Sequence, residues 1–131
     1  MKVYIAGPLF NEGERSYLEK IDKLCKSLKI DTYLPQRDAA VWDGEGDSSW
    51  IYKRDRDAVV ECDFMIAVLN GQAIDPGTAW EIGYAIAKGK KVIGLLEDVR
   101  FRPVDINLMI TNSVQIVQSI ELLRKELEKI K

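Results

Sequence analysis

The sequence predicts an α/β fold: a five-stranded parallel sheet with helices on both faces, which makes a three-layer sandwich. Two observations support this prediction. Short apolar runs alternate with longer stretches of helical periodicity along the chain, and glycine or proline marks several of the junctions between them. A chain of 131 residues with 47% hydrophobic residues can bury one sizeable core, so we expect a single domain over residues 1–131.

Five strands are expected from the apolar runs at residues 3–6, 31–34, 64–69, 91–96 and 114–117. The first run stops at the turn signal Gly7-Pro8, and Pro35 closes the second. The third run is apolar at every position, which is typical of a buried strand. With the strand order 2-1-3-4-5, the loops after the first and third strands meet at one edge of the sheet.

Four helices are expected between and after these strands, over about residues 12–28, 48–62, 75–88 and 119–130. Ser48 or Ser49 can cap the second helix, and Asp75 can cap the third, with Pro76 at its first position. Gly89 ends the third helix. Two long connections remain: a glycine-containing loop over 36–49, expected to be mobile and beside a site, and residues 97–113.

Composition excludes several classes of function. A net charge of −2 and a pI near 5.3 argue against binding to nucleic acid, which requires a basic face. No apolar run approaches a membrane span, and no signal peptide is recognised, so we expect a cytoplasmic protein that does not bind membranes. Cys25 and Cys62 are widely spaced and are expected to be buried free thiols.

The chain contains no histidine, which removes Ser–His–Asp triads, Cys–His pairs and nearly every zinc site. No GxGxxG follows the first strand and no GxxxxGK[ST] occurs, so neither a dinucleotide nor a nucleoside triphosphate is indicated. We therefore expect no metal site. Acid–base chemistry has to come from carboxylates, Lys, Tyr or Cys.

The most informative stretch is Asp75-Pro76-Gly77-Thr78-Ala79-Trp80-Glu81-Ile82-Gly83-Tyr84-Ala85. Glu81 lies in the second turn of the third helix, with Gly77 and Thr78 one turn upstream, so little bulk separates its carboxylate from the strand ends. Ligands bind at that edge of an open α/β sheet. Glu81 is the candidate nucleophile, against the alternative of a solvated helix glutamate. Gly7 is expected to converge on the same place, and the backbones of Gly7 and Gly77 are expected to contact the substrate.

Two further carboxylates are candidates for the same cleft: Asp75 at the loop end and Asp55 on the preceding helix. Asp63, beside the start of the third strand, is assigned a structural role. A pair of carboxyl groups suits glycosyl transfer, in which one attacks the anomeric carbon and the other protonates the leaving group. Tyr4, in the first strand, can donate a hydrogen bond that orients Glu81, although strand tyrosines are more often core residues.

The chain resembles the nucleoside 2-deoxyribosyltransferases over almost its whole length. The resemblance rests on four segments: Tyr4-Ile5-Ala6-Gly7-Pro8-Leu9-Phe10, Asp55 eight residues before Asp63, the Asp75–Ala85 stretch, and Ile106-Asn107-Leu108-Met109. It implies a flavodoxin-like three-layer sandwich, no cofactor, deoxynucleoside and free base as small-molecule partners, and a homo-oligomer, either a dimer or a trimer of dimers.

The resemblance also implies roles for individual residues. Glu81 becomes the nucleophile that forms a covalent deoxyribosyl-enzyme, Asp55 the acid that protonates the departing base, and Tyr4 the residue that orients the nucleophile. Asp75 matches a sugar-binding carboxylate, and Asn107 an asparagine that reaches the sugar 5′-hydroxyl in a neighbouring subunit's site. Preference among bases stays open.

Two alternatives remain. The related 2′-deoxynucleoside 5′-monophosphate N-hydrolases share the carboxyl pair, but they need phosphate-binding groups, and the first loop here is apolar. Arg15, Arg100 and Arg102 keep this alternative open. A non-catalytic nucleoside-binding module is the other alternative, since fold alone does not define function.

Overall fold

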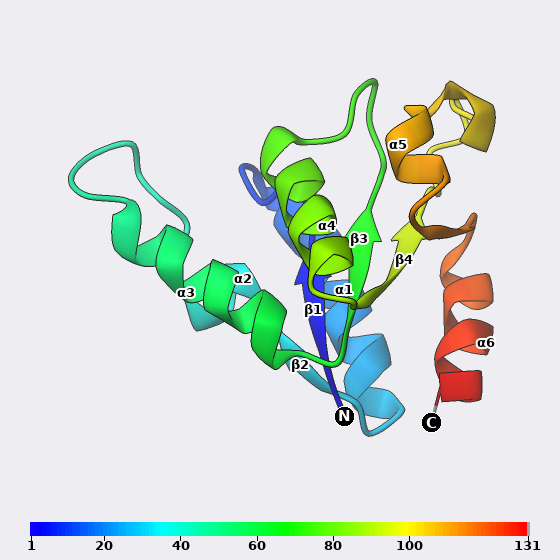
Figure 1. Ribbon diagram of the computed structural model, residues 1–131, viewed down its shortest axis with the longest axis horizontal. Helices are drawn as coiled ribbons and strands as arrows, with labels where there is room; N and C mark the ends of the chain where they lie inside the picture. The colour runs from blue at the N-terminus through cyan, green and yellow to red at the C-terminus, as the bar shows by residue number, and fades with distance from the viewer. Residues whose placement is uncertain (131) are drawn as a thin grey trace.

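The sheet has five parallel strands in the order β2-β1-β3-β4-β5. The computed structural model describes residues 1–130 (Figure 1). The strands are β1 (Lys2–Ala6), β2 (Asp31–Tyr33), β3 (Phe64–Val68), β4 (Lys91–Leu95) and β5 (Gln115–Val117). The predicted strand order is confirmed, and each predicted strand is present to within one residue at each end.

The helices are α1 (Glu12–Ser27), α2 (Pro35–Asp38), α3 (Ser49–Glu61), α4 (Pro76–Ala87), α5 (Leu108–Thr111) and α6 (Ile120–Ile130), with a 3-10 turn η1 (Pro103–Asp105). Helices α1 and α6 cover one face of the sheet, and α3 and α4 cover the other. The predicted α/β sandwich is confirmed. Helix α2, η1 and α5 were not predicted, because each is a short turn inside a segment read as irregular.

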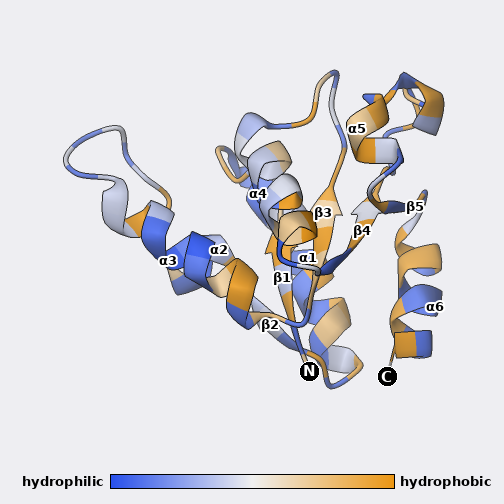
Figure 2. Ribbon diagram, viewed as in Figure 1, coloured by the Kyte–Doolittle hydropathy of each residue, from blue (hydrophilic) through white to orange (hydrophobic). Residues whose placement is uncertain are grey.

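Two apolar clusters hold the layers together. Side chains alternate along each strand, so Val3 and Ile5 face α1 and α6, whereas Tyr4 and Ala6 face α3 and α4. Strand β3 is buried at all five positions because it lies at the centre of the sheet. Figure 2 shows this strand in the hydrophobic colour, while α6 alternates between the two colours as a surface helix does.

Local capping explains where α4 begins. Asp75 precedes the helix, and its Oδ2 accepts a hydrogen bond from the backbone N–H of Thr78 at 2.9 Å. Pro76 occupies the first helical position, where no N–H donor is required. Gly89 follows the helix with φ 74°, in the left-handed region that favours glycine. The predicted cap and the predicted stop are both confirmed, and the cap fixes α4 directly after the loop that follows β3.

The structure also tests the predictions for the two cysteines, for the cap of α3 and for Asp63. Cys25 and Cys62 are buried and free, as predicted. Ser48 precedes α3 but makes no side-chain capping bond; Asp47 instead accepts from the N–H of Ser49 at 2.9 Å. The carboxylate of Asp63 accepts from the N–H of Lys2 at 2.7 Å, which fits the structural role assigned to it. Within residues 1–130, no helix is long and apolar enough to cross a membrane.

Candidate active site

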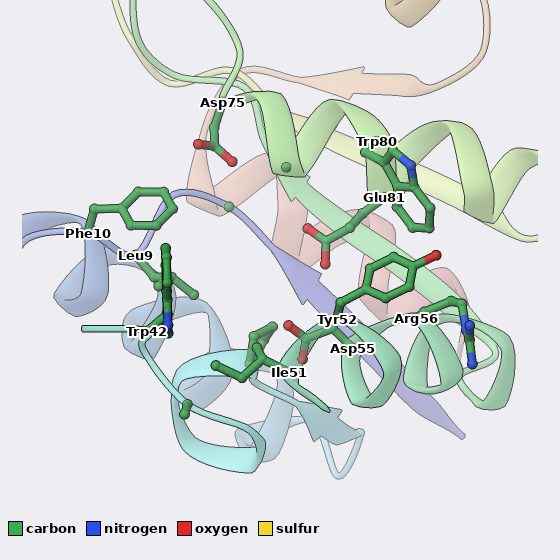
Figure 3. A pocket seen from close by; sticks show the side chains of 14 residues that line it. Leu9, Phe10, Trp42, Ile51, Tyr52, Asp55, Arg56, Asp75, Trp80 and Glu81 are labelled. Carbon is green, nitrogen blue, oxygen red and sulfur yellow. The ribbon is translucent and has the colours of Figure 1, made fainter. Parts of the chain in front are cut away.

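A cavity of about 320 Å³ opens at the carboxyl edge of β1 and β3, where the strand order reverses (Figure 3). Four segments supply its walls: the loop after β1, the segment after β2, helix α3 and the start of α4. The lining residues are Gly7, Leu9, Phe10, Pro35, Ala40, Trp42, Ile51, Tyr52, Asp55, Arg56, Asp75, Gly77, Trp80 and Glu81.

Glu81 lies on the second turn of α4 with its carboxylate directed into this cavity. Its Oε2 accepts a hydrogen bond from the hydroxyl of Tyr4, a fully buried residue of β1. The pKa of Glu81 is raised to about 8, mainly by burial and also by the nearby charges of Asp55 and Asp75, whereas the hydrogen bond from Tyr4 acts in the opposite direction. Burial also raises the pKa of Tyr4, as does the charge of Glu81, so Tyr4 stays a proton donor.

Asp55 approaches the same cavity from α3, and Figure 3 shows its carboxyl group close to that of Glu81. Oδ1 of Asp55 accepts a hydrogen bond from the hydroxyl of Tyr33 at 2.8 Å. Burial raises the pKa of Asp55, opposed by the Tyr33 hydrogen bond and by the charge of Arg54. Two neighbouring carboxyl groups with raised pKa values are typical of sites that carry out acid–base chemistry.

Asp75 occupies the end of the cavity nearest Phe10 (Figure 3). Its Oδ2 accepts from both the N–H and the hydroxyl of Thr78, at 2.9 and 3.0 Å. Oδ1 accepts no hydrogen bond from residues 1–130, which leaves it available to a ligand hydroxyl. The helix cap therefore also presents an oriented acceptor to the cavity.

Flat apolar side chains line much of the cavity: Phe10, Trp42, Tyr52 and Trp80. Phe10 is 68% exposed and Trp42 50% exposed, which is high for such large apolar residues. The rings of Tyr52 and Trp80 meet edge to face at 5.6 Å. Such walls suit a planar heterocycle, which gains stacking energy from aromatic faces.

The sequence predictions did not include this aromatic rim. Its signal was present, since Trp42 is a large aromatic residue in a loop that is otherwise small and polar. Other lining residues without a sequence signal are Leu9, Ile51 and Arg56. Arg56 lies beyond Tyr52, away from Glu81 (Figure 3), and pairs with Asp57 at 3.0 Å.

The structure brings together five of the seven predicted site residues on the cavity wall: Gly7, Asp55, Asp75, Gly77 and Glu81. The sixth, Tyr4, lies beneath the wall and reaches Glu81 through its hydroxyl.

Gly7 is fixed by packing. A Cβ there would lie 2.7 Å from Cδ2 of Leu18 and 3.2 Å from Cβ of Val68, so a larger residue would require both of these side chains to shift. At Gly77, the only such contact within 4 Å is with Oδ2 of Asp75, at 3.3 Å.

Asn107, the seventh predicted residue, lies outside this cavity. It caps α5, where its Oδ1 accepts from the N–H of Met109 at 2.8 Å. It lines a separate hollow with Ile74 and Asp105. Within one chain, Asn107 and Glu81 therefore line different cavities. Among residues 1–130, no group of three or more Cys, Asp or Glu side chains is arranged to hold a metal ion.

A family model described as nucleoside 2-deoxyribosyltransferase matches residues 3–117. The chain therefore belongs to the nucleoside 2-deoxyribosyltransferase family, as its motifs indicated. An uncharacterized protein of Schizosaccharomyces pombe is 30% identical over an alignment of 110 residues, and the match covers 77% of this chain and 52% of that protein. The chain thus spans about half the length of the curated relative it matches.

Solved structures agree on the fold. A conserved protein from Enterococcus faecalis V583 is 34% identical, with full coverage of this chain, 99% of that one and a TM-score of 0.82. A 2-deoxyribosyltransferase from Bacillus psychrosaccharolyticus is 24% identical over 95% of this chain and 90% of that one, with a TM-score of 0.81. A CMP N-glycosidase from Clostridium botulinum is 23% identical over the full length of both chains, with a TM-score of 0.66. The fold thus occurs in both a transferase and an N-glycosidase.

Proposed function

We propose that this protein cleaves the N-glycosidic bond of 2′-deoxynucleosides and passes the sugar to an acceptor base or to water. The observation that carries the proposal is the pairing of Glu81 and Asp55 in one aromatic-walled cavity, each accepting a hydrogen bond from a different tyrosine. Retaining glycosyl transfer requires one carboxylate as nucleophile and one carboxylic acid as proton donor. Glu81 and Asp55 are suited to these two roles.

In the first step, an electron pair of Glu81 forms a bond to C1′ of the deoxyribose. Tyr4 occupies Oε2, which leaves Oε1 for the attack. The C1′–N bond breaks with its electrons moving to the base, and Asp55 gives a proton to the departing nitrogen. The products are a deoxyribosyl ester on Glu81 and a neutral free base.

In the second step, a nitrogen of an acceptor base attacks C1′ from the vacated face and returns a proton to Asp55. Glu81 leaves as a carboxylate, stabilised by the hydrogen bond from Tyr4. Two displacements at C1′ restore its original configuration. Water in place of the acceptor base gives hydrolysis, so transfer and hydrolysis differ only in this second step.

The charges of the cavity favour a nucleoside over a nucleotide. Asp55, Asp75 and Glu81 are three carboxyl groups that line the same cavity, and Arg56 is the only cationic residue among the lining residues. Arg56 is already paired with Asp57. A phosphate carrying a charge of about −2 would meet repulsion here, whereas a sugar hydroxyl can donate to the unpaired oxygen of Asp75.

Preference for a 2-deoxy sugar follows from the same chemistry. A 2′-hydroxyl withdraws electrons from the positive charge that develops at C1′, so a deoxy sugar reacts more readily. Gly7 and Gly77 also line the cavity, and close packing of a sugar ring against their backbones would leave less room for an added hydroxyl.

We also propose that the active form is a homo-oligomer in which Asn107 reaches the sugar of a neighbouring subunit. Asn107 is exposed, and it is followed by Leu108 and Met109, which are 66% and 71% exposed. Exposed apolar side chains in series are typical of a surface that another chain covers. Mixing inactive Glu81→Ala with inactive Asn107→Ala protein should then restore part of the activity. Persistent inactivity of the mixture, or a monomer in solution, would contradict shared sites.

The decisive test of the function is chemical identification of the intermediate. A slow 2-fluoro deoxynucleoside should leave a sugar adduct on Glu81 in mass spectrometry, and Glu81→Ala should lose several orders of magnitude in rate. An adduct on another residue would reassign the nucleophile. Absence of free base from every deoxynucleoside and deoxynucleoside monophosphate would favour a non-catalytic binding module instead.

A further inference from the structure

Two stacked tyrosines each donate a hydrogen bond to a different member of the proposed catalytic pair, Glu81 and Asp55. Tyr4 and Tyr33 are register partners on β1 and β2, and their rings stack with centroids 5.2 Å apart and planes 16° from parallel. The hydroxyl of Tyr4 donates to Glu81, and that of Tyr33 donates to Oδ1 of Asp55 at 2.8 Å. Tyr33 is only 6% exposed and is not among the cavity's lining residues.

We propose that Tyr33 is a positioning residue for the general acid: it holds one oxygen of Asp55, so that the other oxygen carries the proton to the departing base. This inference rests on the proposed function, in which Asp55 is the acid. It assigns a role to a residue that the sequence pattern marked only as part of a strand.

The first argument concerns which oxygen carries the proton. Burial and the hydrogen bond to Asp55 raise the pKa of Tyr33, so its hydroxyl stays protonated and acts as a donor. The oxygen that accepts from Tyr33 is then the carbonyl-type oxygen of a protonated carboxyl group, and the acidic proton resides on the other one. Oδ2 accepts no hydrogen bond from residues 1–130, so it is the oxygen available to substrate.

The second argument concerns the change in charge during the step. As Asp55 gives up its proton, the bond from Tyr33 becomes charge-assisted and therefore stronger. Four ionisable groups lie around Asp55: Tyr33 on β2, Tyr4 on β1, Glu81 on α4 and Arg54 on its own helix. The hydrogen bond from Tyr33 and the charge of Arg54 lower the pKa of Asp55 against the effect of burial, and the charge of Asp55 raises the pKa of Tyr4 and of Glu81. Tyr33 is the only one of the four that fixes the orientation of Asp55 by a direct hydrogen bond.

The test is Tyr33→Phe, which keeps the ring that stacks on Tyr4 and removes only the hydroxyl. We expect kcat/KM for natural deoxynucleosides to fall about tenfold, the usual effect of losing a hydrogen bond to a charged group. A deoxyriboside with a p-nitrophenol leaving group needs no proton, so its rate should stay near that of the wild type. The alkaline limb of the pH profile should move to higher pH, because Asp55 loses a bond that lowers its pKa.

Tyr17→Phe is a matched control. Tyr17 donates to a carboxylate oxygen of Glu97, also at 2.8 Å, and both residues lie outside the cavity. This variant should keep wild-type rates on both substrates. Equal losses on both leaving groups in Tyr33→Phe would mean that Tyr33 serves folding rather than proton transfer, and would overturn the proposal.

Two measurements separate this proposal from the proposed function. In an Asp55→Asn background, Tyr33→Phe should cause no further loss, since both act through one proton. Carbon NMR of labelled aspartate should show the pKa of Asp55 rising in Tyr33→Phe without any substrate present. A rise without turnover by the wild type would refute the enzyme assignment alone. Normal turnover with an unchanged pKa of Asp55 would refute the role of Tyr33.

Discussion

Replacing Glu81 by glutamine should abolish activity and at the same time stabilise the folded protein at alkaline pH. Glutamine keeps the shape of the side chain and an oxygen that can accept from Tyr4, but it carries no charge. In the wild type, an ionised carboxylate has to be held in the cavity wall. Burial and the charges of Asp55 and Asp75 disfavour that ionised form, and only the hydrogen bond from Tyr4 favours it. Active sites commonly sacrifice stability in this way.

The sign and the size of this stability difference follow from the pKa of Glu81, which is about 8 against an ordinary value of 4.5. Below pH 4.5 the side chain is protonated in both folded and unfolded chains, so its raised pKa stabilises the folded state fully. Between pH 4.5 and pH 8 the unfolded chain releases the proton first, and the wild type loses stability at about 1.4 kcal/mol per pH unit. The total loss by pH 8 is roughly 5 kcal/mol. The Glu81→Gln variant does not lose this stability, because glutamine does not titrate.

The assay is urea denaturation of both proteins at half-unit intervals from pH 5.5 to pH 9. The stability difference in favour of Glu81→Gln should grow by about 3 kcal/mol between pH 5.5 and pH 8 and then level off. Glu128→Gln, the same exchange at an exposed position of α6, controls for the loss of one negative charge. A difference that does not change with pH, or a variant less stable than the wild type at pH 8.5, would refute the reasoning.

Three further predictions concern catalysis. Asp55→Asn should lose about 10²–10⁴-fold in rate on natural deoxynucleosides but little on a p-nitrophenol leaving group; equal losses on both would mean that Asp55 serves binding or structure. Tyr4→Phe removes the hydrogen bond that lowers the pKa of Glu81, so the acid limb of kcat/KM against pH should move to higher pH; an unmoved limb would contradict the pairing. Deoxyinosine should be preferred over its 5′-monophosphate in kcat/KM, and the opposite preference would move the protein to the N-hydrolase class.

The fold could be predicted because its signals are local. Each strand is an apolar run of a few residues, and the order of strands and helices along the chain restricts the sheet to few topologies. Asp75 and Pro76 are local signals too, and they predicted the start of α4. Because α4 starts there, Glu81 lies at the edge of the sheet. Pro35 was read only as the end of a strand, although it also occupies the first position of α2.

The parts that were missed depend on contacts between distant segments. Nothing near Tyr33 in the sequence distinguishes a core tyrosine from one that holds a carboxylate. Its partnership with Tyr4 exists only because β2 pairs with β1 in one particular register. Trp42 reaches the cavity through the unpredicted turn of α2 and a loop without regular structure. Asn107 remains a proposal, because its expected place is in another subunit.

Under the proposed function, the three carboxyl groups around the cavity bear on which DNA precursors the protein consumes. Precursors on their way to a polymerase carry phosphates, which the negative charge of ionised Asp55, Asp75 and Glu81 would repel. Unphosphorylated deoxynucleosides carry no such charge and would be the molecules that are cleaved. The protein would then recycle nucleosides and spare the phosphorylated precursors that replication uses.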